Sequence, residues 1–471
     1  MNRHRLIQNS GATLWQCSSG RLTPGLFAAA TALVLLLTPQ LSAQDVAVKG
    51  ATIITMSGER IENGVIIVRD GKIAKVGADL KVPVEATVID AKGKVVMPGI
   101  VDVHSSSGMS QANENNDTVP FLSVIDSIDP KRPYFEESLR NGVTTAAVVP
   151  GNSTMIGGRA AVVKTAGSYV DDMVLKRDVG LKISMAPRSG SRLSHYTKLR
   201  KTLEDVKKAQ KERKEKEEET AKAKAEAEKK AAEKKKEDAK KDGDKKEAKK
   251  PEPKKAAAKT PAAESVTAKA TRDTMEALLA GKLPAYIYCS EAMDVTNAIR
   301  LVEEFKLKPI YVVGRDTYKA AKALAETKAP VILDSRLVSW RTDPRTREDE
   351  KIVLSKIFSE SGCKFLFQAD DRRTGLGSHY HWYQAATAIK YGMAEEDALK
   401  ALTIDAAKAL GIDKFVGSIE AGKDADLVIL SGDPLKVSTW VETTLVGGEV
   451  VYERDKDERL RLLFEPEKDA N

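Results

Sequence analysis

Two histidines with one residue between them, His379 and His381, form a pair whose spacing suits metal binding. Neutral imidazoles are common ligands of Zn²⁺, and several ligands must converge on one ion. On an extended loop, side chains two residues apart point the same way, so both rings would face one site. If the pair instead begins a helix through Trp382 and Ala386, the two rings diverge. The spacing leaves both arrangements open.

Other polar runs suggest two further chemistries, each with a plainer alternative. Residues 105–107 are three serines, but no GxSxG motif accompanies them, so a serine hydrolase is not expected. Gly157 and Gly158, together with Asn152 and Ser153, would form an anion-binding nest or an ordinary loop turn, and the turn is favoured.

Eight short apolar segments supply the framework that must position these residues. They are rich in β-branched side chains and bounded by Gly, Pro or Asp, as is typical of strands buried on both faces. The segments are 97–104, 144–149, 160–164, 181–186, 285–290, 309–313, 331–334 and 364–369. Helical patterns at 295–304, 316–326 and 352–359 separate several of them, although none is evident between the second and the third. The alternation predicts an α/β fold, a (β/α)8 TIM-like barrel with its site at the carboxyl ends of the strands.

Two further groups of short strands lie near the ends of the chain. The first comprises 46–56, 65–69, 72–76 and 87–89, and Asp70 with Gly71 forms a tight hairpin turn between two of these. The second comprises 425–430, 441–446 and 449–452. We expect these N- and C-terminal segments to build one composite β-sandwich domain.

The basic charge of the chain is concentrated in one segment. Residues 198–264 contain 25 Lys and Arg against 17 Asp and Glu, which accounts for the whole formal charge of +8. The opening stretch, 199–241, has opposite charges four residues apart but no apolar stripe, so it would be a solvated helix or disordered. We expect a low-complexity spacer, or alternatively an arm that contacts a partner or an anionic surface. Because no aromatic residues interleave with the charges, nucleic acid is not an expected partner.

The N-terminus has the features of a signal peptide. Arg3, Arg5 and Arg21 precede an apolar run at 26–37, and small residues at 41–43 offer a cleavage site. The run is shorter than the ~20 residues that span a membrane, so an anchor is the weaker interpretation. We therefore expect export to the periplasm or cell envelope, with no transmembrane segment. Cys289 and Cys363 lie in strand-like runs and are expected to be buried thiols.

These patterns divide the chain into seven consecutive regions. They are a signal peptide at 1–43, the N-terminal section of the sandwich at 44–95, the first half of the barrel at 96–197, the charged insert at 198–271, the second half of the barrel at 272–410, the C-terminal section of the sandwich at 411–456 and a polar tail at 457–471.

Four sequence runs resemble those of the metal-dependent amidohydrolase superfamily. Residues 95–104, VVMPGIVDVH, resemble the family's first barrel strand, which ends in His-x-His. Residues 141–145, NGVTT, are similar to the start of its second strand, and 155–160, MIGGRA, to a loop of the imidazolonepropionase-like branch. Residues 416–428, VGSIEAGKDADLV, resemble a strong family signature where the chain returns to the β-sandwich. The resemblance covers nearly all of the chain outside the signal, insert and tail.

The resemblance implies a metal site from which ligands have been lost. In the family, a divalent metal activates a water molecule for attack on a carbonyl or imine carbon, and an Asp handles the proton. His104 fits the first histidine of His-x-His, but Ser106 stands at the second. Tyr288 and Ser290 stand on the fifth strand where histidines are found in the family, and Val313 replaces another on the sixth.

Two further positions have a role implied by the same resemblance. Asp370 fits the catalytic Asp at the end of the eighth strand, and Lys164 stands where a modified or bridging lysine would be. We expect Lys164 to share the pocket rim with Ser106, Tyr288 and Ser290. Asp370 and Lys164 each have a plainer alternative. Asp370 would cap the next loop or pair with Arg372, and Lys164 would form a salt bridge.

Two functions from different classes follow. As a family member, the protein would be a hydrolase of non-peptide carbon–nitrogen bonds, with Zn²⁺ held by His104 and a rebuilt pair of His379 and His381. Without that rebuilding it would bind no metal, and it would be a catalytically silent protein that binds a small molecule or acts as a scaffold of the cell envelope. The ligand deficit favours the second function on chemistry, and ancestry favours the first.

Overall fold

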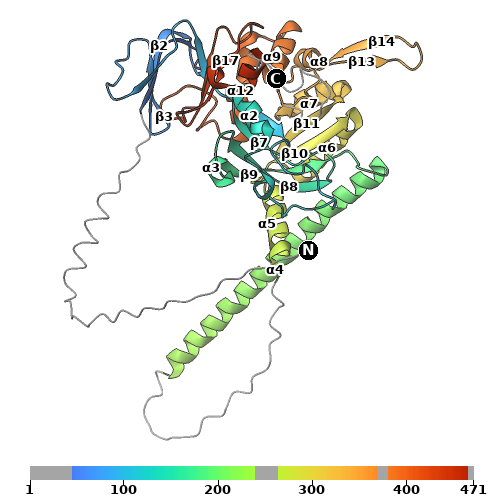
Figure 1. Ribbon diagram of the computed structural model, residues 1–471. Coiled ribbons are helices and arrows are strands. Elements are labelled where there is room, and N and C mark those ends of the chain that lie inside the picture. The colour runs from blue at the N-terminus through green and yellow to red at the C-terminus, as the bar shows by residue number, and fades with distance from the viewer. Residues whose placement is uncertain (1–44, 239–263, 369–379, 465–471) are drawn as a thin grey trace, which may run out of the picture. The chain divides into compact units, whose positions relative to one another are not determined.

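The computed structural model describes residues 45–238, 264–368 and 380–464 (Figure 1). The signal peptide predicted at 1–43 lies outside the described residues. So do the site candidates Asp370 and His379, the central part of the charged insert and residues 465–471 of the predicted polar tail.

Strands from both ends of the chain form one eight-stranded sheet, which we name the two-ended sheet. Its strands are β1 (Val46–Ile53), β2 (Ile61–Arg69), β3 (Lys72–Gly77), β4 (Thr87–Asp90), β5 (Val95–Pro98), β16 (Leu427–Leu430), β17 (Val441–Val446) and β18 (Glu449–Glu453). The order is β18-β17-β16-β5-β1-β2-β3, with β4 beside β1. The junction between the two ends is the antiparallel pair β5–β16. The predicted sharing of one β unit is therefore present, and its two-layered sandwich form stays a prediction.

The predicted hairpin turn between β2 and β3 is confirmed. Arg69 pairs with Lys72, and the two residues between them, Asp70 and Gly71, have φ angles of 48° and 74°. Positive φ at both central positions matches the twist of the flanking strands.

A second eight-stranded sheet, the β6–β15 sheet, carries the candidate site. Its strands are β6 (Ile100–Ser105), β7 (Val143–Val148), β8 (Ile156–Lys164), β9 (Val174–Ser184), β10 (Ala285–Glu291), β11 (Pro309–Asp316), β12 (Val331–Ile332) and β15 (Phe365–Leu366). They lie in the order β15-β12-β11-β10-β9-β8-β7-β6. Each of the eight predicted segments overlaps one of these strands, and every strand contributes side chains to the largest described apolar core.

The prediction of an all-parallel barrel is wrong at its third strand. Strand β8 runs antiparallel to both β7 and β9, whereas the other neighbours in the sheet are parallel. Only seven residues, 149–155, connect β7 to β8, and they contain no helix. A parallel return needs about a dozen residues or more, so this short connection can only reverse the strand direction.

One predicted strand, 97–104, is divided between the two sheets. Strand β5 ends at Pro98 in the two-ended sheet, and β6 begins at Ile100 in the β6–β15 sheet. Gly99, at the crossing, donates its N–H to the carbonyl of Asp426, and a Cβ there would lie 2.0 Å from Thr144 Oγ1. The crossing therefore requires glycine.

Further helices lie beside the two sheets, and several of them pack on strands of the β6–β15 sheet. They are α2 (Pro133–Arg140), α3 (Val170–Met173), α5 (Val266–Leu279), α6 (Ala292–Phe305), α7 (Ala321–Thr327), α8 (Leu354–Glu360), α9 (His381–Lys390), α10 (Glu395–Leu402), α11 (Ile404–Leu410) and α12 (Glu458–Phe464), with short 3₁₀ turns η1 (Val124–Ser127), η2 (Tyr318–Ala320) and η4 (Arg454–Lys456). Helix α10 contacts both edge strands, β6 and β15, so the sheet curves round toward itself. Strands β13 (Val338–Thr342) and β14 (Asp349–Val353) form a separate hairpin (Figure 1).

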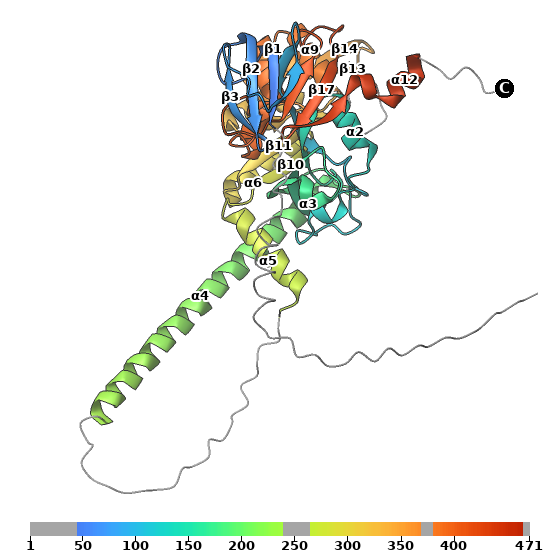
Figure 2. The same ribbon diagram turned by 60° about the vertical axis from the view of Figure 1, so that its left-hand side comes forward.

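The long helix α4 (Arg192–Asp238) spans 47 residues and includes much of the predicted insert (Figure 2). Its first turns belong to the core, because Leu199 and Leu203 are fully buried and α4 contacts α5 and α6. The prediction of an insert without apolar contacts from residue 198 onward is therefore wrong for these turns. Farther along, at residues 214–230, the side chains are exposed. Within the described ranges, no helix is long and apolar enough to cross a membrane.

The two predicted buried thiols are confirmed. Cys289 on β10 and Cys363 before β15 are both buried and both free.

Candidate functional site

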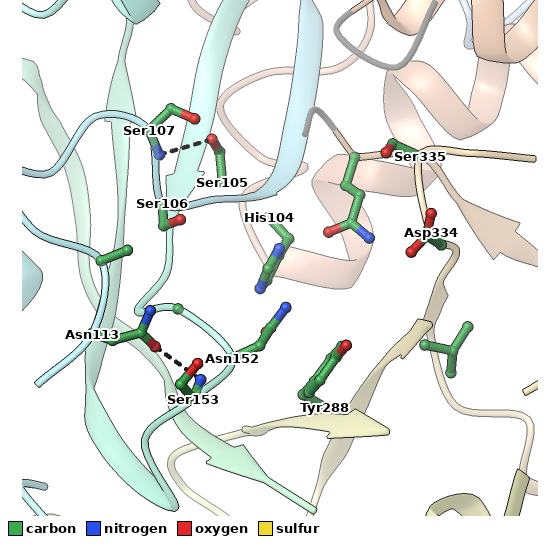
Figure 3. Close-up of a pocket in the computed structure, with 14 residues that line it drawn as sticks. His104, Ser105, Ser106, Ser107, Asn113, Asn152, Ser153, Tyr288, Asp334 and Ser335 are labelled. Atoms are coloured by element: carbon green, nitrogen blue, oxygen red, sulfur yellow. Dashed lines mark hydrogen bonds between the residues drawn. The ribbon is translucent and has the colours of Figure 1, made fainter. Parts of the chain in front are cut away.

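A cavity of about 310 Å³ lies at the carboxyl ends of β6, β10, β11, β12 and β15 (Figure 3). Its lining is mostly polar and uncharged, with one imidazole and one carboxylate. The lining residues are His104, Ser105, Ser106, Ser107, Ala112, Asn113, Gly151, Asn152, Ser153, Tyr288, Val313, Asp334, Ser335 and Gln368. Parallel strands end on the same side of a sheet, which is why residues far apart in the chain meet here.

One wall of the cavity is built from two loops that hold each other. The backbone N–H of Ser153 donates to Asn113 Oδ1 at 2.8 Å, and the N–H of Gly151 donates to the carbonyl of Ala112 at 2.6 Å. Ser184 on β9 donates its hydroxyl to the carbonyl of Asn152 at 2.7 Å. These bonds fix the wall before any ligand arrives, which lowers the entropic cost of binding.

Beneath the cavity, a lysine lies against the predicted site histidine. Lys182 on β9 is fully buried, and its Nζ is 2.9 Å from His104 Nε2 and 5.6 Å from the centre of the Tyr288 ring. Burial lowers the pKa of Lys182 to about 7, because a charged ammonium is poorly solvated there, and Cys289 opposes this to a smaller extent.

A second buried polar group lies one pleat further down β6. Asp102 is fully buried, and its Oδ2 accepts a hydrogen bond of 2.8 Å from the Tyr134 hydroxyl. Its Oδ1 accepts from the backbone N–H of His104 and lies 3.5 Å from His381 Nε2. His381 is the first residue of α9 and is buried beside Asp102, whereas the cavity lining does not include it. The helical alternative for His381 is thus the one the structure adopts.

Only some of the residues predicted at the pocket rim line the cavity. Ser106 and Tyr288 line the cavity, and so does Val313, which stands where the family resemblance expects a histidine. Ser290 instead belongs to the N-terminal cap of α6, where its hydroxyl donates to Asp294 Oδ2 at 2.9 Å and accepts from Arg192 at 3.1 Å.

Lys164 lies away from the cavity, so the prediction that it borders the rim needs correction. Its Nζ forms ion pairs with Asp424 at 3.0 Å and Asp426 at 2.5 Å, beside the two-ended sheet. The reason is the antiparallel direction of β8, because its last residue pairs with Thr145 near the start of β7, at the end opposite the cavity. The plainer alternative of a salt-bridged lysine is the observed one.

The described residues do not fit a bound divalent metal. Among them, no group of three or more His, Cys, Asp or Glu side chains could hold one. Nε2 of His104 lies 2.9 Å from Lys182 Nζ, whose charged form repels a cation. Asp370 and His379 belong to the segment outside the described residues, so their contribution stays a prediction.

Several residues at the site were missed by sequence reasoning. Lys182 gave one usable signal, since it is the single charged residue of an otherwise apolar run at the end of β9 and stands two residues before Ser184, on the same face. Asn113, Asp334 and Gln368 lie in loops or at strand ends without a motif, and only the fold brings them to the cavity.

An α/β sheet with a polar cavity at the carboxyl ends of its parallel strands defines a broad class of enzymes and enzyme-like proteins. Within that class, this chain belongs to the amidohydrolase family, whose model matches residues 95–451. The family assignment made from the sequence motifs is confirmed. Members of the family are hydrolases of carbon–nitrogen bonds and typically bind a divalent metal.

Known relatives agree with this assignment. Amidohydrolase tasK of Hapsidospora irregularis is 25% identical over 413 residues, which cover 81% of this chain but 39% of that protein. The imidazolonepropionase of Porphyromonas gingivalis (strain W83) is 42% identical over 139 residues, 28% of this chain and 31% of that protein. The chain thus spans less than half the length of the first of these relatives. An amidohydrolase structure from Thermotoga maritima MSB8 has a TM-score of 0.67 and 27% identity, and the similarity covers 87% of this chain and all of that one.

Proposed function

We propose that this chain is an exported amidohydrolase-family protein that binds a small polar molecule in the cavity without using a metal. The observation that carries the proposal is the position of Lys182 Nζ, 2.9 Å from His104 Nε2. The protonated form of Lys182 disfavours a cation at the neighbouring imidazole, and in either form the amine lies within hydrogen-bonding distance of that imidazole nitrogen. This contact between Lys182 and His104 supports a cavity that works without a metal.

The cavity has the properties of a small-molecule site. Its volume of about 310 Å³ is at the lower end of the range of roughly 300–1,000 Å³ that is common for ligand pockets. Hydroxyl and amide groups line it, and these can donate and accept hydrogen bonds without imposing a net charge. Asp334, whose Oδ1 accepts from Arg336 Nε at 3.3 Å, contributes the carboxylate in the lining.

A second candidate function is hydrolysis of a carbon–nitrogen bond, and family membership favours it. In this version His104, His379 and His381 would hold the metal, and Asp370 would be the proton shuttle. His381 would then have to leave its place beside Asp102, where its Nε2 lies 3.5 Å from the carboxylate.

Metal analysis of the purified mature protein separates the two candidates. We expect zinc well below one ion per chain, and a thermal unfolding midpoint that does not change when a chelator is added. The matched control is the double variant His379→Ala, His381→Ala, which should behave like the natural protein in both measurements. Near-stoichiometric zinc that is lost in this variant would contradict the first candidate and establish the second.

The proposal also includes the export of the chain and the closure of its sheets. Cleavage near Gln44 would give a mature N-terminus that sequencing of the secreted protein can identify. A cytoplasmic protein that retains residues 1–43 would contradict export.

We further propose that β6 and β15 close a TIM-like barrel and that the two-ended sheet is a β-sandwich, which an experimental structure can test directly.

A further inference from the structure

Three side-chain oxygen atoms of the cavity lining are available to accept hydrogen bonds from a ligand. Asn152 Oδ1 is buried and has no hydrogen-bond partner among the described residues. The two hydrogen bonds that Asp334 accepts from Arg336, at 3.0 and 3.3 Å, both use Oδ1, which leaves Oδ2 for a ligand. Gln368 donates from Nε2 to the carbonyl of Leu333 at 2.7 Å, so its Oε1 is the atom left for a ligand. Because buried polar atoms are nearly always satisfied, a complementary ligand carries several hydrogen-bond donors.

These three acceptors come from separate parts of the fold. Asn152 lies in the loop between β7 and β8, Asp334 follows β12, and Gln368 follows β15. The backbone of the first loop is fixed, because Ser184 donates its hydroxyl to the carbonyl of Asn152 at 2.7 Å. Figure 3 shows Asn152 and Asp334 on different sides of the space that Tyr288 also borders. A ligand that satisfies all three acceptors therefore has its donors distributed around it.

The charges near the cavity favour a neutral ligand. Its described lining contains no lysine or arginine, so an anionic ligand would find no cation there. Asp334 is the single carboxylate of this lining, and Arg336 already forms an ion pair with it at 3.3 Å. An ammonium group on the ligand would compete with Arg336, whereas a hydroxyl group donates without adding charge. Hydroxyl groups also accept, and the serines at 105–107 can donate to them in return.

The volume of the cavity limits the size of this ligand. A space of about 310 Å³ corresponds to roughly ten water molecules at about 30 Å³ each. A five- or six-carbon sugar has about ten to twelve non-hydrogen atoms, and about half of them are hydroxyl or ring oxygens, so its size matches this space.

We propose that the cavity binds a neutral five- or six-carbon sugar or cyclic polyol. Its hydroxyl groups donate to Asn152 Oδ1, Asp334 Oδ2 and Gln368 Oε1. This inference rests on the proposed function, since it names the class of ligand that the same cavity binds.

Isothermal titration calorimetry of the purified full chain tests the inference. The probes are D-ribose, D-glucose, D-galactose and myo-inositol, each titrated separately up to about 50 mM. We expect at least one probe to bind saturably with a Kd of about 1 mM or below. Calorimetry is preferred to thermal unfolding, because polyols at high concentration stabilise most folded proteins through exclusion from their surface. Absence of saturable binding for all four probes would overturn the inference.

Substitutions of Asn152 test the direction of its hydrogen bond to the ligand. Asn152→Ala removes the acceptor, so the Kd of the bound probe should rise at least about tenfold. Asn152→Asp keeps an oxygen that accepts from a hydroxyl group, so the Kd should stay within about threefold of the natural value. Both substitutions leave the backbone bond from Ser184 in place. If Asn152→Asp weakens binding as much as Asn152→Ala, the amide donates to the ligand and the proposed contact is wrong.

Asn115→Ala is the matched control for these substitutions. Asn115 belongs to the same loop as Asn113, but it is exposed and does not line the cavity. The Kd of the bound probe should therefore be unchanged in this variant. A loss of affinity equal to that of Asn152→Ala would show that the probe binds outside the cavity.

A cyclic diamide, hydantoin, separates the inference from the proposed function. If hydantoin binds and none of the four probes does, the cavity still accepts a small polar molecule, and the inference alone fails. Saturable binding of a probe to a chain that contains zinc well below one ion per molecule supports both. Near-stoichiometric zinc would overturn the proposed function and the inference that rests on it.

Discussion

Replacing Lys164 by methionine tests the ion pairs that join the two sheets. Lys164 ends β8, and its partners Asp424 and Asp426 immediately precede β16 of the two-ended sheet. Asp426 also accepts hydrogen bonds from the Thr145 hydroxyl at 3.3 Å and from the N–H of Gly447 at 2.9 Å. The Lys164 side chain is 12% exposed and that of Asp426 is 3% exposed, so water screens this pair only weakly.

The expected loss of folding free energy follows from the charges that Lys164→Met leaves without a partner. Lys164→Met keeps the length of the side chain but leaves two neighbouring carboxylates without their shared cation. Removing one partner of a buried ion pair typically costs about 3–5 kcal/mol, and we expect a loss of folding free energy in that range. Lys72 is the matched control, because its Nζ lies 2.8 Å from Asp424 but its side chain is 55% exposed. Lys72→Met should therefore cost only about 0–1 kcal/mol.

Urea unfolding at pH 7, followed by circular dichroism, measures both losses. Burial raises the pKa of Asp424, but Lys164 and then Lys72 outweigh this effect, so its pKa lies below the usual value. Without Lys164 only Lys72 remains beside Asp424, so the pKa of this carboxylate rises and its protonation relieves the excess negative charge. The difference between Lys164→Met and the natural protein should therefore shrink as the pH falls toward 4. Equal losses for the two variants at pH 7 would refute the reasoning.

Two further predictions concern buried hydrogen bonds. The Arg140 guanidinium donates a hydrogen bond to Asp457 and holds the pKa of that carboxyl below its usual value, although burial opposes this. The carboxylate therefore stabilises the fold above its unfolded pKa of about 3.9. This stability is lost as the pH falls through the lower pKa of the folded state. Asp457→Asn should flatten the dependence of urea stability on pH between about 3 and 5, and an unchanged slope would contradict this pairing. The Tyr286 hydroxyl is buried with no hydrogen-bond partner among the described residues, whereas the Tyr134 hydroxyl donates to Asp102. Tyr286→Phe should leave the thermal midpoint unchanged or raise it, and Tyr134→Phe should cost about 1–3 kcal/mol; the reverse order would show that both hydroxyls have been misassigned.

The sequence contains most of the information on the strands and little on their direction. Apolar runs with β-branched residues located β7, β10 and β11 within a few residues, because burial on both faces selects such side chains. The same pattern is compatible with either direction, so the run at 160–164 predicted a strand without revealing that β8 is antiparallel. The connection of seven residues before β8 held the missing information, and its length alone excludes a helical crossover.

The candidate site was also only partly predictable from the sequence. His104, Ser106 and Tyr288 line the cavity because each stands near or just beyond the carboxyl end of a predicted strand. Lys182 was missed because a lone lysine in an apolar run has no local feature that separates a buried amine from an exposed one. Lys164 was misplaced because its carboxylate partners, Asp424 and Asp426, lie more than 250 residues away in the sequence. Such contacts depend on the completed fold.

The pairing of β5 with β16 has a consequence for the order in which the protein is made. Strand β5 pairs with β1 on one side soon after both leave the ribosome, since fewer than 50 residues separate them. Its other edge stays unpaired until β16 has been synthesised. The first residue of β16, Leu427, pairs with Pro98, and more than 300 residues of chain separate the two. Until the last tenth of the protein has been synthesised, that edge exposes unpaired backbone groups, which attract other strands. Translation that stops before β16 would therefore yield an aggregation-prone chain, even though it would already contain every residue described around the cavity.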